Sequence, residues 1–85
     1  MYLHLGNDTV VSSKDIIGIF DLETTTVSKS SRYFLARAEK NGEVFNVSYE
    51  LPKSFIVCNK TDGGKIIYIS QISCSTLLKR VNFVK

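Results

Sequence analysis

The feature that most restricts the fold is a hairpin signal in the second half of the chain. Residues 60–64, KTDGG, separate two runs rich in β-branched and aromatic residues, Ser54–Asn59 and Lys65–Gln71. Asp-Gly and Gly-Gly steps tolerate the positive φ angles that tight hairpin turns need. The sequence therefore predicts two antiparallel strands joined by this turn.

The second of these strands carries apolar side chains on both faces. Alternation along KIIYIS places Ile67 and Ile69 on one face, and Ile66 and Tyr68 on the other. A sheet with two apolar faces has to be covered on both sides. We expect a helix over one face, and another subunit is a candidate for covering the other.

The main helix is predicted near residues 30–41, within SSRYFLARAEKNG. Either serine at its start can accept a hydrogen bond from the free backbone amides of the first turn. Phe34 and Ala38 lie four residues apart and therefore share a face of the helix. Asn41-Gly42 supplies residue types that adopt the left-handed conformation in which helices often end.

Further strands are predicted before and after this helix. Tyr2–Leu5 and Thr9–Val11 flank a Gly-Asn-Asp turn. The apolar run that begins at Asp15 contains Gly18, which indicates a bulge, a bend or a close backbone approach. After the helix, Val44–Tyr49 is also strand-like.

A short helix is predicted near the end of the sequence, capped by Ser73 or Ser75 and carrying Leu77 on its apolar side. Eighty-five residues leave no room for two domains. The sequence thus predicts one α+β domain over residues 1–85. It consists of a curved, mostly antiparallel sheet with one main helix and a short C-terminal helix.

No sequence pattern indicates catalysis. The chain contains no nucleophile elbow, P-loop, GxGxxG or HExxH motif. The one histidine, His4, lies in a predicted terminal strand, where such a side chain is usually packed or exposed. Cys58 and Cys74 lack CxxC spacing and are expected as reduced thiols in or near the core. We therefore expect no enzyme, no cofactor, no metal site and no small-molecule substrate.

Charge is distributed unevenly along the chain. Residues 1–50 carry five Lys or Arg against seven Asp or Glu, whereas residues 51–85 carry six against one. This asymmetry favours a basic face with an anionic partner, and an ordinary solvated surface is the alternative. No apolar run approaches the roughly 18 residues of a membrane span, and no signal-peptide pattern is present. We expect a cytoplasmic protein without a membrane partner.

Several segments taken together resemble a known family. They are LHLGNDTVVSSKDIIGIFD, RYFLARAEKNGEV, PKSFIV and KIIYISQISCSTLLKR, and they cover nearly the whole chain. They resemble the extracellular matrix regulators of the RemA/RemB family, nearer to its RemB-like branch, in which a PKS-plus-strand segment and an IS-S-TL-KR ending recur. The resemblance implies a bacterial DNA-binding regulator of biofilm matrix genes that forms ring-shaped homo-oligomers. A ring would multiply the weak phosphate affinity of a protomer with a net charge of +3.

One segment departs from the pattern of the family. RemA-like sequences have an arginine-rich turn after a tyrosine, and those arginines are implicated in DNA contact. Here the corresponding residues are Glu50-Leu51-Pro52-Lys53-Ser54. Lysine is a point charge without the planar fork of arginine. Lys53 either contacts phosphate or keeps soluble a turn whose geometry Pro52 fixes.

The predicted function is that of an oligomeric, DNA-binding transcription regulator, which contacts phosphates of double-stranded DNA through basic loops. The predicted contacts are Lys53 in its turn, Lys60 and Lys65 near the hairpin, and Lys79 and Arg80 on the last helix. The alternative is a ring-forming interaction or scaffold module that has lost DNA binding. One continuous rim of cations would support the first, and scattered cations the second. An RNA-binding domain would need exposed aromatic side chains beside the cations.

Overall fold

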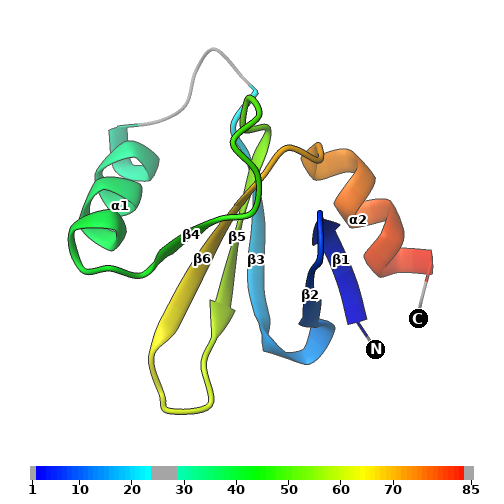
Figure 1. Cartoon of the computed structure of the whole chain (residues 1–85), viewed down its shortest axis with the longest axis horizontal. Coiled ribbons are helices and arrows are strands. Elements are labelled where there is room, and N and C mark those ends of the chain that lie inside the picture. The colour runs from blue at the N-terminus through cyan, green and yellow to red at the C-terminus, as the bar shows by residue number, and fades with distance from the viewer. Residues whose placement is uncertain (1, 24–28, 84–85) are drawn as a thin grey trace.

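The computed structural model describes residues 2–23 and 29–83, without the side chains of residues 29–31, 82 and 83. It has the predicted α+β fold, with two helices on opposite sides of the strands (Figure 1). The elements in chain order are β1 (Tyr2–Gly6), β2 (Thr9–Ser12), the 3-10 turn η1 (Ser13–Asp15), β3 (Ile16–Asp21), α1 (Lys29–Lys40), β4 (Val44–Asn46), β5 (Ser54–Asn59), β6 (Lys65–Ser70) and α2 (Cys74–Phe83).

Four strands form one sheet in the order β3-β5-β6-β4, and β1 pairs with β2 in a separate hairpin. The sheet is mostly antiparallel, but β4 runs parallel to β6. The strand predicted over Val44–Tyr49 is shorter than expected, because β4 ends at Asn46 and Val47 turns into the core. A loop of residues 47–53 then returns the chain to the start of β5.

The β5–β6 hairpin has the predicted turn. Its strands pair without interruption from Ser54 opposite Ser70 to Asn59 opposite Lys65. Gly63 adopts a φ of 88°, which only glycine does readily. The backbone N–H of Lys60 donates to the carbonyl of Gly64 at 2.8 Å, which closes the turn.

The face of the sheet beneath α1 holds the smaller of two apolar clusters. Phe55 and Val57 of β5 and Ile67 of β6 are buried there together with Ala38 of α1. Leu35 of α1 packs at the edge of the same cluster. The predicted apolar face of the main helix is therefore confirmed, and its partner is the centre of the sheet.

The other face of the sheet is covered by the β1–β2 hairpin and α2. Leu3 and Leu5 of β1 and Leu77 of α2 are buried in one cluster. Ile66 and Tyr68 pack against this cluster, so their face is covered within the protomer and not by another subunit as the sequence suggested. The two covering segments come from opposite ends of the chain, and no periodicity in the sequence links them.

A bulge in β1 creates a buried polar link between β1 and β6. The pairing of β1 with β2 shifts between His4 and Gly6, which leaves Leu5 without a partner in the ladder. The carbonyl of Leu5 instead accepts a hydrogen bond from the hydroxyl of Ser70 at 2.6 Å. The same hydroxyl oxygen accepts the backbone N–H of Ile72 at 3.0 Å. Ser70 is completely buried, so its hydroxyl satisfies two backbone groups that have little access to water.

The glycine in β3 marks a bulge, which is one of the three features that the sequence allowed there. The pairing of β3 with β5 shifts between Ile16 and Gly18. The ring of Phe20 lies over Gly18, where a side-chain carbon at position 18 would meet that ring at 2.7 Å. Glycine here allows the close approach of the Phe20 ring, which any larger residue at position 18 would displace.

Both helices end or begin near the predicted positions. Gly42 adopts a φ of 72° just after α1, and its N–H donates to the carbonyl of Glu39 at 3.1 Å. The predicted caps at the start of α1 lie outside the described side chains. At the start of α2, the hydroxyl of Ser73 accepts the backbone N–H of Thr76 at 3.3 Å, which confirms one of the two predicted caps. In the described part of the chain, neither helix has the length and apolar character to span a membrane.

Candidate nucleic-acid interface

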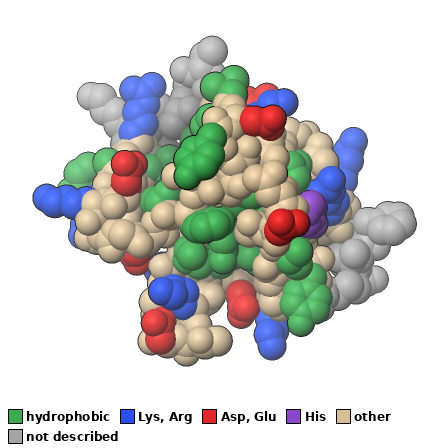
Figure 2. All heavy atoms as spheres, in the orientation of Figure 1, with side chains coloured by type: hydrophobic (Ala, Val, Ile, Leu, Met, Phe, Trp, Pro, Cys, Tyr) green, Lys and Arg blue, Asp and Glu red, His purple; other side chains and the backbone are tan. Residues whose placement is uncertain are grey.

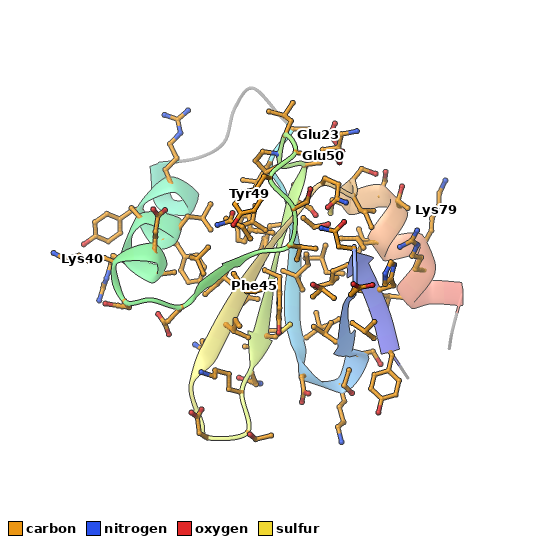
Figure 3. The ribbon with its side chains drawn as sticks, viewed as in Figure 1. Glu23, Lys40, Phe45, Tyr49, Glu50 and Lys79 are labelled. Carbon is orange, nitrogen blue, oxygen red and sulfur yellow. The ribbon has the colours of Figure 1, made fainter. Side chains whose placement is uncertain are left out.

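Lys53 is held through its backbone at one end of the sheet. Its N–H donates to the carbonyl of Ser70 at 2.9 Å, and its carbonyl accepts the N–H of Leu22 at 2.9 Å. Its side chain is exposed, but Glu50 in the same loop and Glu23 after β3 lie at the same end of the molecule (Figure 3). Two carboxylates at this end of the molecule outweigh the one ammonium of Lys53 in charge, which disfavours a phosphate contact.

Lys60 and Lys65 flank the turn of the β5–β6 hairpin, and both are exposed. Lys65 lines a groove beside α1. Lys60 lines a different groove together with Asp15 and Tyr68, on the face that α2 covers. The two hairpin lysines therefore serve different faces of the sheet and do not combine into one site.

The C-terminal helix presents the clearest basic surface. Lys79 and Arg80, which we call the α2 basic corner, are exposed, and α2 contains no carboxylate. The guanidinium of Arg80 donates to the carbonyl of His4 at 3.0 Å. This bond anchors the Arg80 side chain against β1 and leaves most of its five N–H donors for solvent or a ligand.

The five predicted contacts do not form one continuous rim. Lys53 and Lys60 flank opposite ends of β5, a separation of roughly 20 Å for a strand of this length. The α2 basic corner lies elsewhere, because α2 is on the far side of β1 from the sheet (Figure 1). On the face visible in Figure 2, cations and carboxylates are interspersed. The structure brings together only Lys79 and Arg80.

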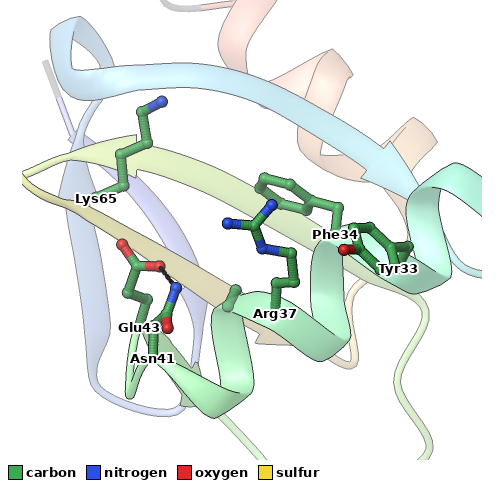
Figure 4. A pocket seen from close by; sticks show the side chains of 7 residues that line it. Tyr33, Phe34, Arg37, Asn41, Glu43 and Lys65 are labelled. Carbon is green, nitrogen blue, oxygen red and sulfur yellow. Dashed lines mark hydrogen bonds between the residues drawn. The ribbon is translucent and has the colours of Figure 1, made fainter.

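A groove of about 340 Å³ lies beside α1 (Figure 4). The residues that line this α1 groove are Tyr33, Phe34, Arg37, Ala38, Asn41, Glu43 and Lys65. The guanidinium of Arg37 lies 5.9 Å from the centre of the Tyr33 ring. This groove was not predicted, although the two aromatic residues between two arginines in RYFLAR are a signal for it in the sequence.

The loop between β4 and β5 exposes apolar side chains that were not predicted as a surface feature. Tyr49 is 100% exposed and Leu51 is 80% exposed. The backbone N–H of Glu50, between them, donates to the hydroxyl of Ser48 at 3.1 Å. We call residues 49–51 the Tyr49–Leu51 loop. Its side chains are presented to solvent and not to the core.

The two cysteines have the expected reduced, structural character. Both are free thiols, with Cys58 buried and Cys74 partly buried. Burial, with a smaller contribution from the charge of Asp15, raises the pKa of Cys58 to about 11. Burial, with a smaller contribution from Asp21, also raises the pKa of Cys74. Raised pKa values keep both thiols protonated near neutral pH, which is unfavourable for a nucleophile or a metal ligand.

The fold and its surface define a small α+β domain whose polar chemistry lies on exposed cations, carboxylates and aromatic side chains. Among the described residues, no group of three or more His, Cys, Asp or Glu could hold a metal ion.

The chain belongs to the RemA-like family. The sequence pattern of the family, described as extracellular matrix regulatory protein A-like, matches residues 2–81. The chain is 42% identical over 84 residues to extracellular matrix regulatory protein B of Bacillus subtilis (strain 168), an alignment that covers 99% of this chain and 94% of that protein. The resemblance found in the sequence is therefore confirmed, and the family name supports a regulatory role.

Proposed function

We propose that this protein is an oligomeric transcription regulator of the RemB-like type that binds double-stranded DNA and has no catalytic activity. The observation that supports this proposal most directly is the α2 basic corner. Lys79 and Arg80 project from a helix without carboxylates, and Arg80 is anchored to the carbonyl of His4. A homo-oligomer would repeat this pair along the duplex and so multiply weak phosphate contacts.

The other three predicted contacts support this surface to different degrees. Lys60 and Lys65 are exposed and add positive charge from the hairpin. Glu23 and Glu50 lie together at one end of the molecule, and the backbone of Lys53 is bonded to Leu22 near Glu23, so the contribution of this lysine is the weakest of the five. Specificity would then depend on DNA shape and on repeated sites, because phosphate contacts carry little base information.

The test is a fluorescence anisotropy titration of an AT-rich duplex across about 50–200 mM salt. We expect a steep loss of affinity with salt. Lys79→Gln should weaken binding. It should also reduce the slope of log affinity against log salt concentration by about one for each protomer on the duplex, since each protomer loses one phosphate contact. Arg32→Gln removes the same charge from exposed α1 and is the matched control. Equal effects of the two substitutions would contradict the assignment of the site.

A scaffold function is the second candidate, because the predicted cations are scattered over the molecule and Glu50 stands in the turn where the family has arginines. This candidate predicts an oligomer that shows no DNA binding even at the lowest salt. A single-stranded RNA of equal length belongs in the same titration, since Tyr33 beside Arg37 meets the aromatic requirement of the RNA-binding alternative.

A further inference from the structure

The face of the sheet under α1 is only partly closed. A helix is about 10 Å wide, whereas four strands spaced about 4.8 Å apart span a wider surface. On the side of β3, the ring of Phe20 stacks on Phe55 at 4.9 Å, and Phe34 of α1 lies 6.3 Å from Phe55. Phe20 and Phe34 remain 45% and 40% exposed. An apolar surface thus continues from the α1 groove towards β3.

The α1 groove carries an excess of positive charge. Arg37 reaches it from α1 and Lys65 from β6 (Figure 4). The one carboxylate of the groove, that of Glu43, accepts a hydrogen bond from the amide of Asn41 at 3.5 Å. A surface of this composition favours an occupant that is apolar and acidic at once.

The Tyr49–Leu51 loop has this composition. Two exposed apolar side chains flank the carboxylate of Glu50, and Glu23 adds a second acid at the same end of the molecule. The loop is anchored on one side by buried Val47, whose N–H donates to the carbonyl of Ile69 at 2.9 Å, and on the other by the two backbone bonds of Lys53. An anchored loop loses little conformational entropy on docking, and exposed tyrosine is a side chain typical of interface hot spots.

We propose that the Tyr49–Leu51 loop of one copy docks in the α1 groove of a second copy. Tyr49 and Leu51 would cover Tyr33, Phe34 and Ala38, while Glu50 would pair with Arg37 or Lys65. This inference rests on the homo-oligomer of the proposed function and assigns the two surfaces that form it. Tyr49 is completely exposed, so its side chain does not occupy the groove of its own chain, and a neighbouring copy can dock there.

The loop and the groove are different surfaces, so the contact is head-to-tail. Each docked copy keeps one free loop and one free groove, and the chain of copies grows until a rotation closes it into a ring. The α2 basic corner belongs to neither surface, whereas Lys65 lies in the groove and would be partly covered by docking. Substitutions in the α2 basic corner should therefore remove DNA contact without removing assembly.

The test uses two assembly-defective variants and measures their sedimentation velocity without DNA. The loop variant carries Tyr49→Ser with Leu51→Ser, and the groove variant carries Arg37→Glu; all three positions are exposed, so folding is unaffected. Each variant alone should self-associate at least about tenfold more weakly than the parent. An equimolar mixture should form a dimer and nothing larger, because only one intact loop and one intact groove can meet.

A charge exchange and a control complete the test. Glu50→Arg together with Arg37→Glu in one chain should restore assembly relative to either substitution alone. Tyr2→Ser with Val10→Ser removes an equivalent exposed apolar pair from the β1–β2 hairpin and should leave assembly unchanged.

The proposal is overturned if the parent protein is monomeric, if the loop variant assembles like the parent, or if the mixture of variants stays monomeric. A parent that assembles through these surfaces but does not bind DNA would support the docking proposal and refute the DNA proposal. The loop variant should no longer assemble, but its monomers should still bind DNA with the salt dependence of a single protomer. This result would support both the docking proposal and the DNA proposal.

Discussion

Ser70→Ala should destabilise the domain far more than the loss of one hydroxyl from the surface. The side chain is completely buried, and its oxygen joins two backbone groups, the carbonyl of Leu5 at 2.6 Å and the N–H of Ile72 at 3.0 Å. Alanine fits the space but satisfies neither group. Leu5 lies at the bulge of β1, so the ladder offers its carbonyl no other partner.

The magnitude follows from the two orphaned groups. Leaving one buried backbone group unpaired costs about 1–3 kcal/mol. The carbonyl of Leu5 is fully buried and bears the full penalty, whereas the N–H of partly buried Ile72 recovers some hydration. We expect a total of about 2–3 kcal/mol, against a stability of about 4–13 kcal/mol for a domain of this size. The corresponding fall in Tm is about 8–24 °C.

The assay is urea unfolding followed by circular dichroism, at one protomer concentration for all variants because self-association shifts apparent stability. Ser75→Ala removes the same hydroxyl from an exposed position on α2 and should stay within about 0.5 kcal/mol of the parent. A Ser70→Ala variant that also stays within about 0.5 kcal/mol would show that the link between β1 and β6 contributes nothing to stability, and the reasoning would be refuted.

Three further predictions concern other parts of the core. Leu77→Ala should cost about 2–5 kcal/mol in urea unfolding because Leu77 is completely buried, whereas Leu78→Ala, at a position 44% exposed, should cost much less; equal costs would contradict the packing of α2. The free energy of unfolding should fall as pH rises from 9.0 to about 11, because the Cys58 thiol ionises at a lower pH in the unfolded chain than in the folded one. A Cys58→Ala variant measured over the same pH range should lose less stability than the parent, because it has no thiol to ionise at this position. Gly6→Ala should lower thermal stability by about 1–3 kcal/mol, since Gly6 has a φ of 120° and a new side-chain carbon would lie 2.9 Å from the amide of Gln71; an unchanged Tm would argue against this backbone conformation.

Local signals predicted the elements well because they act within a few residues. The KTDGG turn, the glycine in β3 and the Asn-Gly end of α1 all have the predicted conformations. Each depends on a backbone preference that the sequence states directly. The alternation in β6 likewise identified two buried faces, although not what covers them.

The long-range arrangement could not be predicted in this way. Nothing local indicates that Val44–Asn46 pairs in parallel with β6, since that register depends on where α1 places the chain. The spatial arrangement of the predicted cations could not be predicted either. Lys53 and Lys60 are only seven positions apart in sequence, yet an intervening strand places them at opposite ends of the sheet. Charge counts by segment therefore predicted a basic half of the chain but not the separation of its cations.

The buried link between Leu5 and Ser70 also sets the order in which the protein can fold during synthesis. At about 5–20 residues per second, the ribosome adds Ser70 roughly 3–13 s after Leu5. Leu77, which is buried in the same cluster as Leu3 and Leu5, is added later still. Chaperones that bind short apolar strands would therefore meet the first strand of every new chain, and substitutions that slow closure of α2 over β1 should lower the yield of folded protein before they change its final stability.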